Sequence, residues 1–204
     1  MIHPMPPALR SFFRRDTVTL ARALLGQTMV RTLRGKRLSG VIVEVEAYLG
    51  IPDRAAHTHD GRRTPRNEVM WGEAGHAYVY FTYGMHHCVN VVARRDGIPE
   101  AVLIRALQPV EGIEIMARHR PAARRETDLC SGPAKLCQAL RIDRTLNGTD
   151  LTRPGPLIIE RTRSRPFPSR RITVSKRIGV DYAGEWANKP LRFHLQANPH
   201  VSRP

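Results

Sequence analysis

The segment from Val41 to Gly50, which reads VIVEVEAYLG, constrains the fold of this chain more than any other stretch. Its alternating pattern predicts a strand with valines on one face and with Glu44, Glu46 and Tyr48 on the other. A buried carboxylate is costly unless it is paired, hydrogen-bonded or used in chemistry. The segment therefore fits either an edge strand with a solvated carboxylate face or one wall of a functional site.

The charge balance limits the class of partner. The chain has 204 residues and a formal net charge of +15, with 33 Lys plus Arg against 18 Asp plus Glu. This excess predicts a polyanionic partner, which is DNA, RNA or an anionic membrane surface. Arginine supplies most of the positive charge and can bind two phosphate oxygens at once. We find no apolar run that could span a bilayer and no signal-peptide pattern, so we expect no membrane partner and a cytoplasmic, nucleoid-associated protein.

The cysteines do not point to a disulfide framework or a metal site. Cys88, Cys130 and Cys137 are odd in number, and their spacing does not match a zinc motif. The histidines are scattered without a ligand-like pair. We therefore expect structural thiols, no metal and no cofactor.

The chain length favours one domain. We expect the proline-rich residues 1–15 to form a flexible arm and residues 16–204 to form the domain. The pattern predicts strands near 27–33, 38–48, 101–107, 157–160 and 191–195, and a hairpin over 76–93 with its turn at 83–86. Helices are expected after an N-cap at Asp16, from Pro109 to about Arg120, and from an N-cap at Ser131 to Leu140.

The long irregular stretch 50–75 carries His57, Arg62 and Arg66 and shows no periodicity. Loops of this length inside a compact domain are usually functional or disordered. A mobile surface loop is one interpretation. We favour a substrate-binding loop with phosphate-contacting arginines, because it directly follows the two carboxylates.

The predicted hairpin over residues 76–93 has unusual turn chemistry. Tyr83 and Met85 stand at its tip, where Asn, Asp and Gly are more common. Apolar wedges that insert between base steps are a device of minor-groove binders. Alternatively, the tip folds back onto the core. The local sequence does not decide between the two.

Two further basic residues lie in predicted regular elements. Arg105 interrupts the apolar strand AVLIRAL, so we expect a carboxylate or phosphate partner for it. Lys135 follows the expected start of a helix, where it would help to hold a phosphate. An ordinary capped helix explains Lys135 equally well.

Several stretches together resemble the alkyladenine (3-methyladenine) DNA glycosylase family. They cover nearly the whole chain and read LARALLGQ (20–27), VEVEAYLG (43–50), AAH with GRRTPRN (55–67), YVYFTYGM (78–85), VLIRALQPVEG (102–112), LCSGPAKLCQAL (129–140) and AGEWANKPLRF (183–193). The chain departs from the vertebrate members at His86 and His87, where larger aromatic residues are common. The resemblance implies an α+β fold, with a single mixed domain around a curved, mainly antiparallel sheet, peripheral helices and a protruding β-hairpin.

The resemblance also implies a function. It implies a hydrolase acting on N-glycosyl bonds in base excision repair, which binds double-stranded DNA through the minor groove as a monomer and flips out a damaged purine. The implied substrates are 3-methyladenine, ethenoadenine and hypoxanthine, and the product is an abasic site. No lysine is placed as a nucleophile near Glu46, so we expect a monofunctional enzyme.

By resemblance, Glu46 activates the attacking water and Arg105 helps to hold it. The base pocket and the DNA contacts are implied to comprise Tyr48, His57, Tyr80 and Asn90 for the base, with Tyr83 and Met85 at the hairpin tip. Arg62, Arg66 and Lys135 are expected to contact DNA. Cleavage of a glycosidic bond through an oxocarbenium-like state requires a carboxylate, but chemistry alone does not choose between Glu44 and Glu46.

Two other functional classes compete with this interpretation. Charge and hairpin would suit a non-enzymatic nucleic-acid-binding protein equally well. A nuclease would normally need clustered metal-binding carboxylates, and the acidic residues are too scattered for that. The set of Glu46, Tyr48, His57, Tyr80 and Asn90 distinguishes the glycosylase, because a pure binder would not need it.

Overall fold

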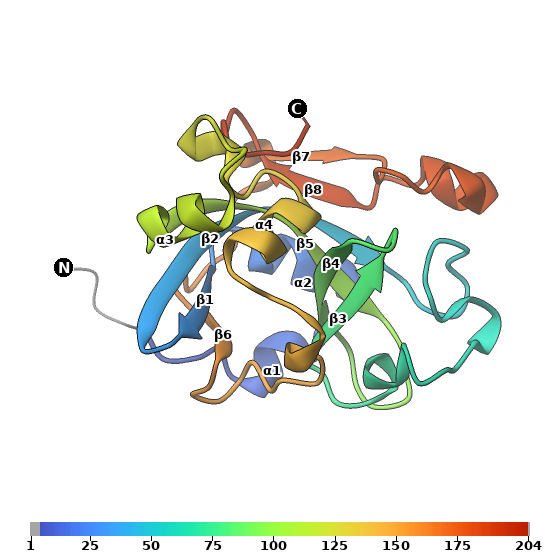
Figure 1. The fold of residues 1–204 in the computed structure, drawn as a ribbon. Helices are drawn as coiled ribbons and strands as arrows, with labels where there is room; N and C mark the ends of the chain where they lie inside the picture. Colours follow the sequence, from blue (N-terminus) through green and yellow to red (C-terminus); the bar gives the residue numbers. More distant parts are fainter. Residues whose placement is uncertain (1–4, 204) are drawn as a thin grey trace.

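A computed structural model describes residues 5–203. It contains one eight-stranded antiparallel sheet that does not close into a barrel, in the order β3-β4-β5-β2-β1-β6, with β8 joining β2 and β7 joining β8 (Figure 1). The strands are β1 (Thr28–Leu33), β2 (Lys36–Tyr48), β3 (Ala77–Thr82), β4 (His86–Val92), β5 (Ala101–Glu111), β6 (Leu157–Glu160), β7 (Ile172–Ser175) and β8 (Arg192–Leu195). The predicted mixed α+β fold with a mainly antiparallel sheet is confirmed.

The helices are short and peripheral. They are α1 (Arg10–Phe13), α2 (Thr17–Leu24), α3 (Ile113–His119), α4 (Pro133–Ala139) and the 3-10 turns η1 (His59–Gly61), η2 (Glu68–Trp71), η3 (Glu126–Asp128), η4 (Arg144–Leu146), η5 (Ser169–Arg171) and η6 (Asp181–Asn188). Within residues 5–203, no helix is long and apolar enough to cross a bilayer.

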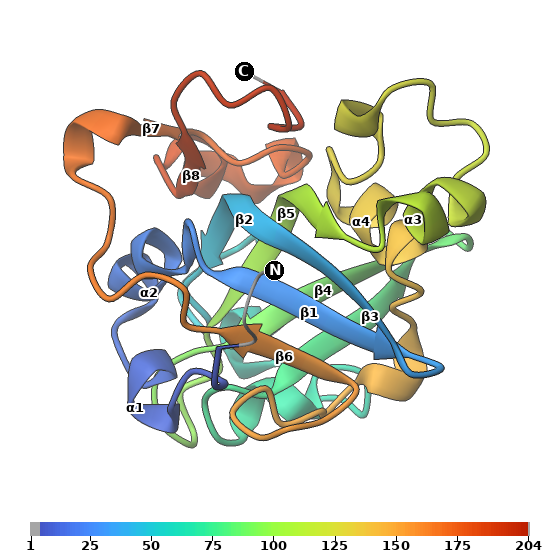
Figure 2. The same ribbon diagram turned by 90° about the vertical axis from the view of Figure 1, so that its left-hand side faces the viewer.

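Strand β2 lies at the centre of the sheet (Figure 2). Its first half pairs with β1, its second half pairs with β8, and β5 runs along its other side. Both Glu44 and Glu46 are fully buried. The interpretation of this segment as an edge strand with a solvated carboxylate face is therefore wrong, because strands cover both edges of β2.

Register shifts in the β2–β5 pair bring charged side chains together. The register steps from Ile42 to Glu44 on β2, and from Ala106 to Ile104 on β5, so Val43 and Arg105 stand outside the regular pairing. Bulges of this kind re-aim side chains and are common near active sites. Here the bulge on β5 carries Arg105, whose guanidinium lies between the two β2 carboxylates.

The N-terminal segment is packed rather than loose. The Ala8 amide donates to the Ile159 carbonyl at 2.8 Å, and Phe12 and Phe13 are buried in the core. The expectation of a flexible arm is wrong for residues 5–15, because these aromatic side chains bury apolar surface; residues 1–4 lie outside the described part. The Asp16 N-cap is confirmed, since its carboxylate accepts from the Thr19 amide at 2.9 Å.

Two predicted helix starts are corrected. Pro109 does not open a helix; it lies within β5 opposite Gly40, at a register shift where a missing amide is tolerated. Helix α3 begins later, after Gly112, which has a φ of 73°. Ser131 is not the N-cap of α4, because its backbone forms a bridge to Ala106 and Gly132 takes the cap position.

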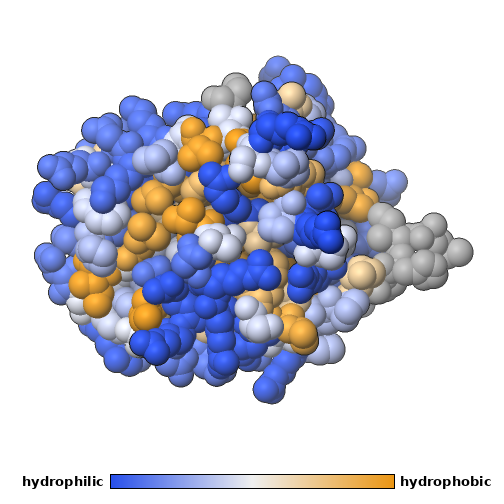
Figure 3. Space-filling model, turned by 180° about the vertical axis from the view of Figure 1, so that it is seen from behind, coloured by the Kyte–Doolittle hydropathy of each residue, from blue (hydrophilic) through white to orange (hydrophobic). Residues whose placement is uncertain are grey.

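Trp186, near the last strand, is half-buried in η6 with the Lys189 ammonium 3.4 Å from its ring centroid. From behind, hydrophilic residues surround separate apolar patches on the surface (Figure 3). On this face, hydrophilic residues therefore cover more of the surface than apolar ones.

Candidate active site

A cavity of about 300 Å³ opens between the hairpin β3–β4, the loop after β2 and the segment before η6. These elements gather on one side of the molecule, at the right of Figure 1. Six of the predicted site residues line it, namely Tyr48, His57, Tyr80, Tyr83, Asn90 and Arg105. Its volume is at the lower end of the range for small-ligand pockets.

Aromatic rings form the walls of this cavity. The rings of His57 and Tyr80 meet edge to face with centroids 4.6 Å apart. His57 Nδ1 and the Tyr78 hydroxyl share a hydrogen bond of 2.8 Å. Burial, together with the charges of Arg66 and Arg62, lowers the pKa of His57 to about 4. The imidazole is therefore neutral at physiological pH.

Asn90, on β4, lies in the cavity wall. Its side-chain amide donates to the Tyr78 carbonyl at 3.0 Å, and the residue is buried. The hydrogen bond fixes the orientation of the amide. Asn90 thus presents a rigid polar group to whatever occupies the cavity.

Glu46 lies directly behind the cavity wall, and three lining residues hold it. The Tyr48 hydroxyl donates to Oε2 at 3.0 Å, the Ile178 amide donates to Oε1 at 2.8 Å, and Arg105 Nη1 lies 3.2 Å from Oε1. Burial raises the pKa of Glu46, while Arg105, the Ile178 amide and the Tyr48 hydroxyl oppose the rise. The carboxyl group is thus held by several donors and still resists ionisation.

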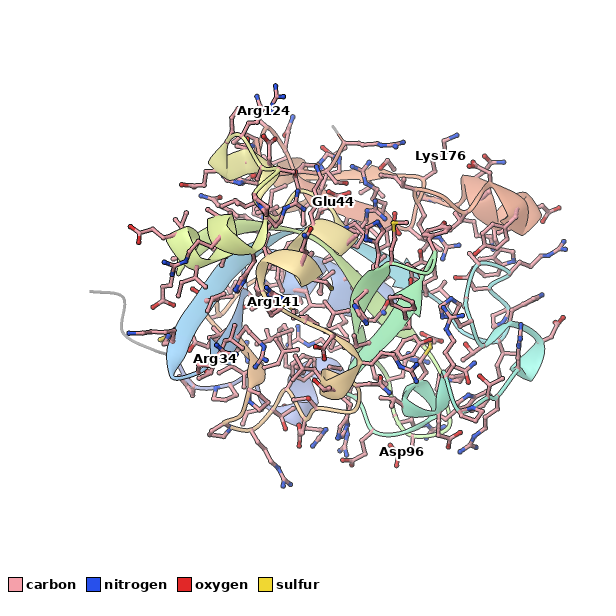
Figure 4. The ribbon with its side chains drawn as sticks, in the orientation of Figure 1. Arg34, Glu44, Asp96, Arg124, Arg141 and Lys176 are labelled. Atoms are coloured by element: carbon pink, nitrogen blue, oxygen red, sulfur yellow. The ribbon has the colours of Figure 1, made fainter. Side chains whose placement is uncertain are left out.

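Glu44 occupies a different environment two residues earlier. Oε1 accepts from Arg192 Nε at 2.7 Å and from Arg105 Nε at 3.1 Å, and Ser202 binds both carboxylate oxygens through its amide and hydroxyl. Figure 4 shows Glu44 inside the molecule, where β2 and β8 meet. Although burial acts to raise it, the Ser202 amide, Arg105 and Arg192 together hold the pKa of Glu44 below its ordinary value.

The two neighbouring carboxyl groups have opposite pKa shifts. Glu44 stays ionised and satisfies two buried arginines. Glu46 has the raised pKa that suits a proton acceptor working near neutrality. The two glutamates therefore lie in different environments, with Glu44 held by Arg192 and Arg105 and Glu46 held against the cavity wall.

Comparisons with known proteins identify the family of this chain. A family model described as methylpurine-DNA glycosylase (MPG) matches residues 11–199. The chain belongs to this family. It is 49% identical to a Methanocella arvoryzae protein provisionally named 3-methyladenine DNA glycosylase, over 98% of this chain and 97% of the relative. It is 46% identical to the human DNA-3-methyladenine glycosylase, over 94% of this chain and 66% of the human protein.

As a methylpurine-DNA glycosylase, the protein is a hydrolase that acts on N-glycosyl bonds in DNA. This assignment rules against both the non-enzymatic binder and the nuclease. Among residues 5–203, no group of three or more His, Cys, Asp or Glu side chains is arranged to hold a metal ion.

The hairpin tip of the glycosylase projects into solvent. Tyr83 is 82% exposed and Met85 is 69% exposed, so the alternative in which the tip folds back onto the core is wrong. Tyr83 lines the mouth of the cavity, whereas Met85 lines a separate hollow with His86, His87 and residues of α4. The tip therefore presents two apolar side chains beside the entrance.

The predicted DNA-binding residues Arg62, Arg66 and Lys135 lie on different parts of the surface. Arg62 and Arg66 are exposed and line a second hollow, which shares Ala55, His57 and Tyr182 with the first cavity. Arg66 also lies over the Tyr80 ring, 5.2 Å from its centroid. Lys135 is exposed on α4, two residues after Pro133 in the cavity wall, with Nζ 3.3 Å from Ser131 Oγ.

The sequence did not indicate several groups that complete the site. Asp53, Arg177 and Arg192 are buried and charged, and Ser202 lies close to the end of the chain. Arg177 stands in a stretch without any helical or strand period, so no local pattern marks it. A signal for these groups would have been the need of each buried carboxylate for an arginine partner.

Proposed function

We propose that this glycosylase flips a damaged purine nucleotide out of duplex DNA into the cavity and hydrolyses its N-glycosidic bond with a water activated by Glu46. The proposed substrates are 3-methyladenine, ethenoadenine and hypoxanthine in DNA bound through the minor groove, and the product is an abasic site. One observation carries the proposal. Glu46 is hydrogen-bonded or ion-paired to three groups, from Tyr48, Ile178 and Arg105, that all line the same cavity.

The chemistry follows from the position of this carboxylate. Departure of the base leaves an oxocarbenium-like sugar, which a carboxylate stabilises while it accepts a proton from water. A raised pKa makes Glu46 a stronger base than an ordinary carboxylate. Arg105 contacts Glu46 from the cavity wall and is proposed to hold the water and the flipped nucleotide beside it.

The aromatic walls favour alkylated bases. An alkylated purine carries positive charge and is already a good leaving group. The faces of Tyr48 and Tyr80 attract a cation by ~0.5–2 kcal/mol per contact. A neutral His57 completes the wall without repelling that charge. Asn90 is proposed to exclude normal guanine by crowding its exocyclic amine.

Entry into the cavity requires base flipping, which costs a few kcal/mol and least for a damaged base. Tyr83 is proposed to fill the gap left in the duplex, with Met85 beside it. Arg62, Arg66 and Lys135 are proposed to contact phosphates. The formal charge of +15 supports tight, salt-dependent binding of DNA by a monomer.

The reaction is proposed to stop at the abasic site. The residues that line the cavity include no lysine, so no amine is placed to form a Schiff base with the sugar. Borohydride trapping on damaged duplexes tests this point. A covalent protein–DNA adduct would contradict the monofunctional reaction.

Base release by wild type and Glu46→Gln decides the mechanism. We expect wild type to release 3-methyladenine, ethenoadenine or hypoxanthine from duplexes under single-turnover conditions, and Glu46→Gln to bind the same DNA without releasing base. Glu114→Gln, at an exposed position on α3, serves as the matched control and keeps wild-type activity. Full activity in Glu46→Gln would show that another group activates the water.

A further inference from the structure

A second fully buried ion pair lies beside the site and has no part in the reaction described above. Arg177 Nη1 is 2.6 Å from Asp53 Oδ2, and Arg177 Nη2 is 2.9 Å from Asp53 Oδ1. Both side chains have zero exposure. In Figure 4 the preceding residue, Lys176, points away from the protein, so the chain turns Arg177 inward.

The Arg177 guanidinium joins β2, η6 and one aromatic wall of the cavity. It donates to the Ala47 carbonyl at 3.0 Å and to the Trp186 carbonyl at 3.2 Å. Its central carbon lies 4.6 Å from the centroid of the Tyr48 ring. One side chain thus connects the end of β2, an aromatic wall of the cavity and η6.

The Asp53 carboxylate fixes the start of the loop that carries His57. Besides Arg177, it accepts from the Leu49 amide at 2.9 Å and from the Ala55 amide at 3.0 Å. Ala55 lines both the base cavity and the second hollow. The carboxylate therefore sets the path of the chain between Tyr48 and His57.

The residue after Arg177 makes direct contact with the reacting carboxylate. The Ile178 amide donates to Glu46 Oε1 at 2.8 Å. Ile178, Gly179 and Val180 all line the cavity. Because the peptide between residues 177 and 178 is planar, the anchored position of Arg177 helps to fix the direction of this N–H group.

A buried ion pair is poor evidence for stability, because desolvation offsets most of the Coulomb attraction. Its placement between the end of β2, the Tyr48 ring and η6 indicates a different role. We propose that Arg177 and Asp53 form a positioning pair that holds the Ile178 amide on Glu46 and the Tyr48 ring in the cavity wall, without touching the substrate. This role rests on the proposed function of Glu46.

The test compares Arg177→Lys, the double variant Arg177→Met/Asp53→Leu, Glu46→Gln and wild type in single-turnover release of ethenoadenine across pH. The double variant removes both charges, so neither is left unpaired in the interior. We expect the rate of base release to fall about 10–100-fold, as when an outer-shell partner is lost. We also expect the acid limb of the rate profile to move to higher pH, because the carboxylate loses a donor, while binding of undamaged DNA is unchanged.

The Arg177→Lys variant tests whether a conservative change preserves part of the rate of base release. Arg177→Lys keeps the charge opposite Asp53 but cannot form the two-point contact, so its rate should fall between wild type and the double variant. Arg37→Lys is the matched control, since Arg37 pairs with Glu160 at the other end of β2. It should lower thermal stability without moving the acid limb.

An NMR readout separates this proposal from the role of Glu46. The Ile178 amide proton should resonate at low field in wild type and move upfield in both Arg177 variants. Folded Arg177 variants with a wild-type rate, acid limb and Ile178 resonance would overturn the positioning role. If Glu46→Gln retains activity while the Ile178 resonance still moves in the Arg177 variants, the proposed base is wrong and the positioning of the amide stands.

Discussion

Glu44 and Glu46 share one guanidinium, since Arg105 Nε lies 3.1 Å from Glu44 and Nη1 lies 3.2 Å from Glu46. Burial raises the pKa of Glu46, whereas the donors around Glu44 hold its pKa low. The lowered pKa of Glu44 stabilises the folded state at pH values above 4.5, the ordinary pKa of a glutamate. This stabilisation is lost as the pH falls. The raised pKa of Glu46 has the opposite effect, because it lowers the stability of the fold as the pH rises above 4.5.

The two glutamates should therefore respond differently to loss of charge. Glu44→Gln removes the counter-ion of Arg192 and half of that of Arg105, so we expect a loss of about 3 kcal/mol at pH 7. Glu46→Gln relieves a buried charge and should cost much less, although we expect it to abolish base release. Urea denaturation of both variants measures the difference. Equal destabilisation would contradict the assignment of separate roles.

His57 provides a pH-dependent test. Burial, with Arg66 and Arg62 nearby, lowers its pKa from 6.5 to about 4, so the unfolded chain binds a proton that the folded protein does not. This contribution to stability is complete above pH 6.5 and disappears as the pH falls towards about 4. His57→Gln should lose less thermal stability than wild type between pH 7 and pH 5. NMR titration of the ring gives the pKa directly, and an ordinary value would contradict the prediction.

The sequence predicted the structural features that depend on local patterns. The β2 alternation, the interrupted strand around Arg105 and the Asp16 cap are signals within a few residues. The contacts that it missed join residues far apart, such as Arg177 with Asp53 and Ser202 with Glu44. No periodicity encodes such pairs, because only the folded chain brings them together.

The missed element boundaries have a similar cause. Proline and serine, the residue types at positions 109 and 131, are both favoured at helix starts. In the structure, pairing with Gly40 keeps Pro109 in β5, and a bridge to Ala106 occupies Ser131. Tertiary pairing overrides local preference at both positions.

Arg62 tests the proposed phosphate contacts. It is exposed beside the cavity, and no ion pair holds it among the residues that the structure describes. Arg62→Ala should weaken binding to all DNA sequences and reduce the slope of log affinity against log salt by about 1. Arg124→Ala, an exposed arginine in the connection after α3 (Figure 4), is the matched control and should leave the slope nearly unchanged. Equal slopes for wild type and Arg62→Ala would remove Arg62 from the DNA contacts.

Tyr83, which is proposed to fill the gap in the duplex, has a backbone conformation that suits another residue. Tyr83 and Gly84 have φ values of 52° and 67°, and the Met85 amide donates to the Thr82 carbonyl at 3.3 Å. Positive φ at both central positions is the requirement of a type I′ turn, for which Asn-Gly is preferred. We expect Tyr83→Asn to stabilise the hairpin by about 0.5–1 kcal/mol. The same change should reduce base flipping, because the side chain that is proposed to fill the duplex gap is lost.

The β1–β2 turn supplies the control for this prediction. Arg34 and Gly35 have φ values of 49° and 73°, and Figure 4 shows Arg34 on the side of the molecule away from the cavity. Arg34→Asn should give a similar gain in stability without any effect on flipping. Fluorescence of 2-aminopurine placed next to the lesion reports flipping, and urea denaturation reports stability. Unchanged fluorescence in Tyr83→Asn would show that Tyr83 does not fill the gap.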